Sequence, residues 1–195
     1  VRVSDVLGDG EPIDLTDALI CEIQGTSFTT PVDGEEVTTR NNVVTARANN
    51  GFFIQMTERE DECADQASRG LFVFTGGSPS VSTEDLVDIT AEAEDFNGWT
   101  QLSSGPSIDV VGSAPVPDPV TFDATTPDPS PRIVPDIYRY QSMLVEVENA
   151  ISTSGSDRFG NFYVDAGGDL DVERNYRQPG LPFPGQDGFP VWDGN

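Results

Sequence analysis

Histidine and lysine are both absent from this chain of 195 residues, and each absence excludes a class of function. Without histidine the chain cannot assemble a Ser-His-Asp or Cys-His catalytic unit, and it offers zinc no imidazole ligand. The two cysteines are too few for a structural zinc site of four thiolates. The basic residues are all arginine, ten against 34 acidic residues, so the formal charge is -24. Such a charge favours solubility and repels polyanions such as nucleic acids.

Long apolar runs are also missing. No stretch approaches the ~18 consecutive apolar residues of a membrane-spanning helix, so we expect no membrane span. No basic segment followed by an apolar one opens the sequence, so any signal peptide is expected to have been removed or to lie upstream. A strongly acidic, solvated surface is typical of proteins from salty or calcium-rich surroundings. Because nucleic-acid affinity depends on basic side chains, we expect weak, salt-sensitive or absent DNA binding, with Arg40, Arg47 and Arg69 as the candidate contacts.

Glycine (19) and proline (15) are abundant, which favours turns and short strands over long helices. Asn49-Asn50-Gly51 and Asn97-Gly98 are expected to form hairpin turns, because Asn and Gly accept positive φ. Asn41-Asn42 is expected to bend or bulge the longest strand. Strands at this short, even spacing are typical of an all-β barrel or sandwich. The expected strands are residues 20–24, 36–48, 52–57, 70–75, 85–93, 99–102 and 108–111.

The composition changes after residue 112. Seven prolines lie between residues 112 and 135, a density that favours an extended connector over a second core. Further strands are expected at residues 143–147 and 159–164. The sequence therefore divides into a lead-in segment (1–20), a β-barrel (21–112), a proline-rich connector with additional strands (113–180) and a Pro/Gly-rich tail or linker (181–195).

Several short motifs occur in order along the first half of the chain. They are Ile23-Gln24-Gly25, Val43-Val44-Thr45-Ala46, Gly51-Phe52-Phe53-Ile54-Gln55, Gly70-Leu71-Phe72-Val73-Phe74 and Gly98-Trp99-Thr100-Gln101-Leu102. A looser second half contains Arg139-Tyr140-Gln141-Ser142-Met143-Leu144-Val145, Asp157-Arg158-Phe159-Gly160 and Arg177-Gln178-Pro179. The ordered set resembles the OB-fold-like accessory domain that precedes the catalytic domain in large secreted bacterial nucleases of the endonuclease/exonuclease/phosphatase type. Gln141 and Ser142 depart from that family's pattern.

The resemblance implies an all-β, OB-fold-like barrel with additional strands and a proline-rich extended arm. It also implies a non-catalytic accessory role in a secreted, extracellular nuclease-like protein. Such a domain positions its partner, the downstream catalytic domain, or holds substrate weakly. The catalytic centre of that family needs two histidines, so the chain is not expected to be an enzyme. The alternative is a structural or assembly module of an extracellular or cell-surface polymer. There a terminal segment, residues 1–7 or 181–195, would dock on a neighbouring copy by strand addition to form a filament.

The two cysteines are Cys21 and Cys63. In a secreted protein an even number of cysteines favours a disulfide, and two independent thiols are the alternative. We expect the bridge, which would stabilise the fold by a few kcal/mol because it closes a long loop.

Five aromatic residues of the expected barrel have two interpretations. OB-folds stack single-stranded bases on such side chains, whereas aromatic residues of most proteins are buried in a core. Alternation along a strand places Phe52 or Phe53, but not both, in the core, and it places Phe72 and Phe74 on one face. Core packing is the expectation, and the residues concerned are Phe52, Phe53, Phe72, Phe74 and Trp99.

Two acidic clusters offer oxygen ligands of the kind that Ca2+ prefers. One is Glu58, Glu60, Asp61, Glu62 and Asp65; the other is Asp165, Asp169, Asp171 and Glu173. Neither has the spacing of an EF-hand loop, and solvated acidic runs are the more ordinary interpretation. No cofactor is therefore expected, with Ca2+ as the one candidate.

The tail is rich in proline and glycine and yet carries large apolar side chains. A flexible linker does not normally carry that much apolar surface. We therefore expect residues 181–195 to dock in a groove, on the same chain or on a neighbouring molecule. The docking side chains would be Phe183, Phe189 and Trp192.

Overall fold

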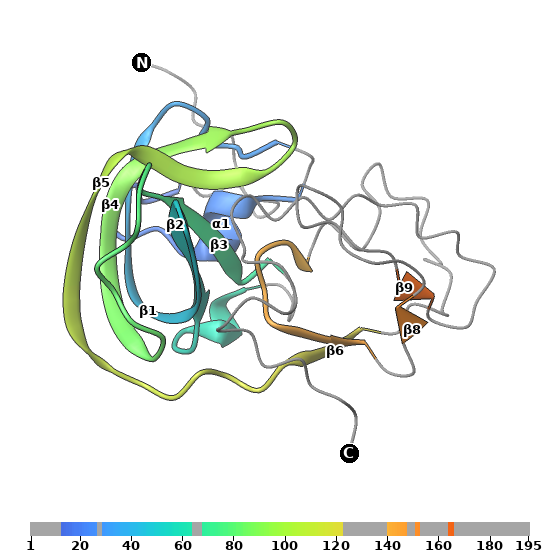
Figure 1. Ribbon diagram of the computed structural model, residues 1–195. Coiled ribbons are helices and arrows are strands. Elements are labelled where there is room, and N and C mark those ends of the chain that lie inside the picture. The colour runs from blue at the N-terminus through green and yellow to red at the C-terminus, as the bar shows by residue number, and fades with distance from the viewer. Residues whose placement is uncertain are drawn as a thin grey trace.

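Five strands form the main body of the protein, and their pairings close into a ring (Figure 1). The computed structural model describes residues 13–26, 29–63, 68–122, 140–147, 151–152 and 164–165. The five strands are β1 (Glu36–Ala48), β2 (Gly51–Met56), β3 (Gly70–Phe74), β4 (Asp85–Asp95) and β5 (Thr100–Ser113). Around the ring they follow the order β1-β2-β3-β5-β4, and β4 pairs back onto β1. Within the ring only the β3–β5 pair is parallel. The predicted all-β class is confirmed.

Local signals in the sequence place most of these strands correctly. Both predicted hairpins are present, since Ala48 pairs with Gly51 across one turn and Asp95 pairs with Thr100 across the other. The predicted bulge at Asn41-Asn42 is confirmed as well: the register against β4 shifts there, and Asn41 has a φ of 53°. The predicted strands 99–102 and 108–111 are parts of the single long strand β5.

The prediction of a strand at residues 20–24 was wrong, because Ile20–Gln24 forms the helix α1. Ile20 and Ile23 lie three positions apart and are both fully buried, which is the spacing of one helix face. At the start of the helix, Leu19 donates its backbone N–H to the Glu22 side chain at 2.8 Å and so satisfies an amide that has no partner inside the helix. Five residues are too few for strand and helix periods to be told apart from the sequence.

Apolar side chains from alternate positions of the strands fill the inside of the ring. α1 contributes to the same core and contacts β3, where Gln24 Nε2 donates to the Gly70 carbonyl at 2.6 Å. The alternation predicted for β4 is confirmed. The fully buried side chains of this core include Ile20, Ile23, Val37, Val44, Phe52, Ile54, Leu71, Val73, Val87, Ile89 and Leu102.

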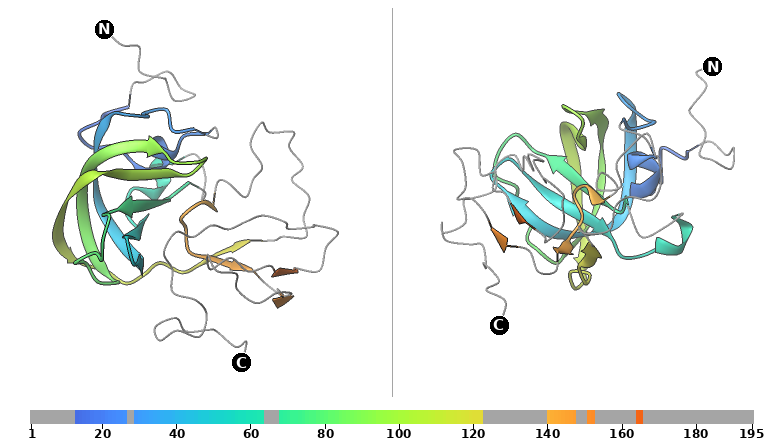
Figure 2. Two further views of the ribbon diagram at one scale, coloured as in Figure 1. Left: turned by 45° about the horizontal axis from the view of Figure 1, so that its top comes forward. Right: turned by 90° about the vertical axis from the view of Figure 1, so that its right-hand side faces the viewer.

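Short elements follow the ring. After β2 comes the 3-10 turn η1 (Glu60–Glu62), and after β5 comes β6 (Val120–Phe122), which pairs in parallel with β7 (Val145–Val147). The left-hand view of Figure 2 shows this two-stranded sheet beside the ring. A separate two-stranded sheet, which is antiparallel, joins β8 (Ile151–Ser152) to β9 (Val164–Asp165). The expected strand at 143–147 is thus shorter than predicted, and most of the strand expected at 159–164 lies outside the described residues. Residues 1–12 and 166–195 lie outside them too.

Candidate functional site

The two cysteines form the predicted disulfide. It joins Cys21 in α1 to Cys63, which directly follows η1, with a Cα–Cα distance of 6.1 Å. The bridge therefore fixes the helix to the loop between β2 and β3. In the described part of the chain no helix is long and apolar enough to cross a membrane. The disulfide is compatible with an extracellular setting.

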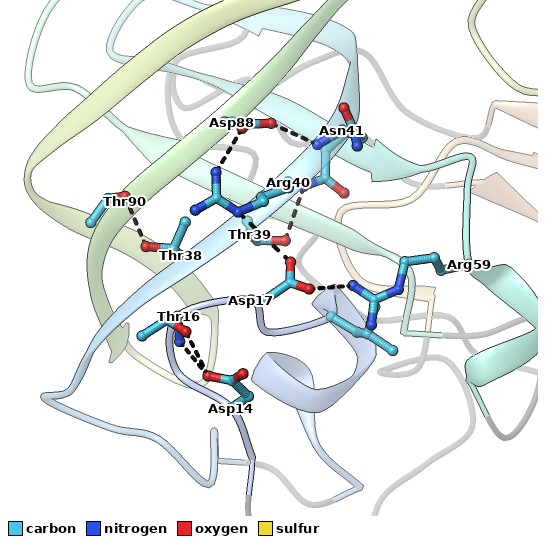
Figure 3. A network of polar contacts seen from close by, with 12 residues as sticks. Asp14, Thr16, Asp17, Thr38, Thr39, Arg40, Asn41, Arg59, Asp88 and Thr90 are labelled. Atoms are coloured by element: carbon cyan, nitrogen blue, oxygen red, sulfur yellow. Dashed lines mark hydrogen bonds and ion pairs between the residues drawn. The ribbon is translucent and has the colours of Figure 1, made fainter.

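A polar network surrounds a cavity of about 320 Å³ at the bulge of β1 (Figure 3). Arg40 donates to Asp88 at 3.0 Å, and Asp88 also accepts the backbone N–H of Asn41 at 2.9 Å. Asp17 lies between two guanidinium groups, 2.9 Å from Arg59 and 3.8 Å from Arg40. The bulge thus directs the Arg40 side chain towards Asp17 and Asp88, which belong to two other segments. The carboxylates at this cavity therefore balance the positive charge of the arginines.

Arg59 is held on its other side by Glu62. Its guanidinium makes two hydrogen bonds to that carboxylate, at 2.7 and 3.0 Å, an orientation that adds geometric precision to the charge pairing. These hydrogen bonds lower the pKa of Glu62 and raise that of Arg59. Because both side chains are well exposed, the pair is a weak contribution to stability. Its effect is to position Arg59 against Asp17.

The three arginines proposed as nucleic-acid contacts lie in different surroundings. Arg40 belongs to the network just described. Arg47 donates to the Pro79 carbonyl at 2.8 Å, and Arg69 forms an ion pair with Glu60 at 3.0 Å. Arg69 is mostly buried, with 13% of its side chain exposed, so its charge serves an internal contact. The described structure brings these three side chains into no common network.

Acidic side chains likewise form ion pairs within the chain. Glu60 and Glu62 of the first predicted cation cluster pair with Arg69 and Arg59. Among the described residues, no group of three or more acidic or cysteine side chains could hold a metal ion. The second cluster lies almost wholly outside the described residues: Asp169, Asp171 and Glu173 are not described, and Asp165 is described only as part of β9.

A second apolar cluster lies on the other face of β2 and β3. Its buried members are Ala48, Phe53 and Phe72. The ring centroids of Phe53 and Phe72 lie 4.9 Å apart, and Trp99 packs edge-on against Phe72 at 6.5 Å. Phe74 is partly buried against the same cluster. As predicted, one of Phe52 and Phe53 but not both belongs to the main core, and Phe72 and Phe74 share a face; the structure shows that the core residue is Phe52. Phe53 and Phe72 are only 4% and 1% exposed, so they are packed rather than available for stacking.

Residues 140–144, here called the strap, contact the edge of this aromatic face. Trp99 Nε1 donates to Ser142 Oγ at 3.1 Å, and the Thr100 backbone N–H donates to the Gln141 side chain at 3.1 Å. The Leu144 backbone N–H donates to the Gln55 side chain at 2.9 Å, and Gln55, near the end of β2, is only 3% exposed. A buried amide that accepts such a bond would be costly to leave unpaired. The strap is therefore an integral part of this face.

Glycine makes the close approach of the strap possible. A Cβ at Gly70 would lie 2.6 Å from the Met143 nitrogen and closer still to the Ser142 carbonyl oxygen. Met143 lies beside it, 9% exposed, with its sulfur 3.5 Å from the Arg69 backbone nitrogen. This contact was not predicted from the sequence. The one local sign of this contact in the sequence is Gly70, the first residue of a buried strand. Glycine inside a sheet often marks a site where another backbone segment approaches closely.

Asp95 accepts hydrogen bonds on the β4 side of the turn to β5. The Thr30 backbone N–H lies 3.0 Å and the Thr100 hydroxyl 3.4 Å from its carboxylate. Burial raises the pKa of Asp95 from the usual 3.8, and the nearby Asp33 adds to the rise. The folded chain thus holds this proton more tightly than the unfolded chain does. The associated stabilisation is present below pH 3.8 and is lost as the pH rises through the raised pKa.

Asp95→Asn is therefore expected to raise the melting temperature at pH 7, because the amide keeps an acceptor for Thr30 and removes a buried charge. A rise of ~1 to 3 °C is expected from the size of the chain. The advantage should shrink as the pH falls through the raised pKa and should be gone below pH 3.8. Calorimetry at several pH values measures it, with Asp118→Asn, at an exposed acid, as the matched control. Equal gains from both variants would assign the effect to net charge alone.

No family model, curated protein or solved structure matches this chain.

Proposed function

We propose that the chain is a non-catalytic, OB-fold-like accessory domain of a secreted nuclease-like protein, and that it positions the downstream part of that polypeptide. OB-folds are five-stranded Greek-key barrels, and the closed order β1-β2-β3-β5-β4 with one parallel pair supports this assignment. The ordered motifs of the sequence support the accessory role. No histidine is present to serve a nuclease centre.

The strap is the observation that carries the positioning role. OB-folds bind their ligands on the face of strands 2 and 3. Here that face holds buried aromatic side chains, and residues from later in the same chain are hydrogen-bonded along its edge. A face that docks its own downstream segment acts as a platform for the rest of the polypeptide rather than as an open substrate groove.

The charge of the chain also favours a positioning role over the binding of nucleic acid. The net charge of -24 repels a phosphate backbone, and Arg40 and Arg69 already have carboxylate partners. Holding nucleic acid would require these ion pairs to be exchanged. Contact with another part of the same polypeptide requires no such exchange.

The proposal predicts that the isolated chain does not cut plasmid DNA in Mg2+ or Ca2+, whereas the native polypeptide that contains it does. Antibody against the chain isolates the native product, whose intact mass should exceed the 21.0 kDa of these residues. Heat-treated product and a mock purification are the controls. A nuclease-free native product of 21.0 kDa contradicts the accessory role. Cleavage that follows the isolated chain through repeated chromatography contradicts the non-catalytic assignment.

An assembly module is the second candidate: the edge of β5 with which no described strand pairs would offer the docking site, against the repulsion between two chains of charge -24. Strand addition by residues 1–7 or 181–195 of a neighbouring copy would extend the sheet there. Light scattering of the native product separates the two functions, because concentration-dependent polymers would support assembly and a monomer would support the accessory role.

A further inference from the structure

The second half of β5 is a free strand edge. After a register shift between Ser103 and Ser107, β5 pairs with β4 at residues 107–110, and after a second shift at Val111 it pairs again at residues 112–113. No further strand among the described residues pairs with the other side of residues 107–113. Figure 1 shows β5 as the outer strand at this end of the sheet. Its backbone therefore presents hydrogen-bonding groups along roughly 23 Å of extended chain.

The corresponding edge of β1 is covered, which sets β5 apart. Thr38 donates its backbone N–H to the Leu15 carbonyl at 2.7 Å and accepts the Ala18 N–H at 2.8 Å. The N-terminal segment thus continues the hydrogen bonding past β1. Within the part of the chain that the structure describes, one edge is covered by residues 15–18 and the other has no partner strand.

Large apolar side chains lie on the open edge. Val110 is 56% exposed and Val111 is 51% exposed, and every residue from 109 to 113 is exposed. Exposed apolar residues on a strand edge favour pairing with another strand, and natural proteins usually place charges there to prevent it. The edge of β5 has both exposed apolar residues and a charge, since Asp109 directly precedes Val110 and Val111.

Acidic residues near the edge disfavour a second copy of the chain. Asp109 is exposed at the edge itself, whereas Asp88 across from it is already paired with Arg40. Two copies would bring together chains of charge -24. Asp109 and this net charge attract a basic segment, so the charge selects the occupant.

We propose that the edge of β5 formed by residues 107–113 binds an extended, basic segment of another protein by strand addition. The backbone of the incoming segment pairs with β5, its apolar side chains cover Val110 and Val111, and its Lys or Arg side chains meet Asp109. This inference goes beyond the proposed accessory function and does not depend on it.

Binding of labelled peptides to the full chain tests the proposal. The probe is an octapeptide of alternating lysine and valine. The comparisons are an octapeptide of alternating lysine and glycine, with equal charge, and one of alternating glutamate and valine. Fluorescence anisotropy is measured at ~0.15 M salt, where the screening length is ~8 Å. We expect only the lysine–valine peptide to bind measurably.

Two substitutions locate the site. Val110→Lys is expected to weaken binding about tenfold, since it removes an apolar contact and adds a repelling charge at the edge. Phe96→Lys makes the same change in charge at another exposed apolar residue, 54% exposed in the β4–β5 turn, and should alter binding less than twofold. Melting temperatures near that of the parent chain confirm that both variants fold.

Four results overturn the proposal. They are absence of lysine–valine binding, equal binding of the lysine–glycine peptide, equal losses in the two variants, and self-association of the chain that Val110→Lys abolishes. The second and third would assign binding to general charge attraction, and the last would make a second copy the occupant.

Discussion

Replacing Gly70 with alanine is expected to release the strap from the sheet. The added methyl group would occupy space held by backbone atoms of Ser142 and Met143, and backbone cannot yield as a side chain tip does. The bonds from Trp99, Thr100 and Leu144 would then be strained or lost together. At ~0.5 to 1.5 kcal/mol for each hydrogen bond, we expect a loss of about 2 to 4 kcal/mol in the free energy of unfolding.

Fluorescence of Trp99 reports the release directly. The chain has two tryptophans, so a Trp192→Phe background leaves Trp99 alone. Release should shift its emission to the red, because the indole loses the Ser142 partner, and should lower the melting temperature by roughly 5 to 15 °C. Gly77→Ala is the matched control, since a Cβ there meets nothing within 4 Å.

The release prediction separates a docked strap from an incidental contact. If Gly70→Ala melts like Gly77→Ala and keeps the emission of the parent chain, the strap does not hold this face and the positioning role loses its structural basis. A variant that melts earlier but keeps its Trp99 emission would place the damage inside β3 instead.

Loss of the Cys21–Cys63 disulfide is expected to have an effect of similar size. The bridge spans a sequence separation of 42 residues, for which the chain-entropy relation gives ~4 kcal/mol at 25 °C. For a chain of this length that corresponds to a fall in melting temperature of roughly 8 to 16 °C. The physical reason is that the open loop gives the unfolded chain more conformations, while α1 keeps its buried isoleucines in the folded one.

Calorimetry of the oxidised and reduced chain measures this effect. The double variant Cys21→Ser and Cys63→Ser should melt at the temperature of the reduced chain and should not respond to reductant. A parent chain whose melting temperature is unchanged by full reduction, with thiol labelling of both cysteines as proof, would show that contacts of α1 and η1 already order this loop.

Local chemistry explains which parts of the fold were predictable. The turn at Asn97-Gly98 has positive φ at both residues, 55° and 80°, and only a few residue types supply it. The turn at Asn49-Asn50-Gly51 forms where it was expected, although none of its three residues has positive φ. The alternation in β4 follows from one buried face and one solvated face. The pairing of the two cysteines needed only their number and an oxidising setting.

Contacts between distant residues explain what was missed. The strap depends on Gln55, Gly70 and Trp99 meeting residues some 40 to 90 positions later, and no local pattern encodes such a meeting. The partners of Arg40 and Arg69 were missed for the same reason, since Asp88 and Glu60 become neighbours only through pairing of strands and loops. Short α1 was misjudged because tertiary burial, not propensity, decides the conformation of five residues.

The parallel β3–β5 pair has a consequence for how the chain folds. It joins Phe72 to Gln101 and Val73 to Leu102, while β4 must already have turned back along β1 to bring β5 into place. Contacts between residues so far apart cost loop-closure entropy before they return any stability, and they slow folding. During synthesis the ring stays open until Leu102 has left the ribosome, and until then β3 keeps an unpaired edge. The strap leaves the ribosome later still, and it binds to a sheet that has already closed.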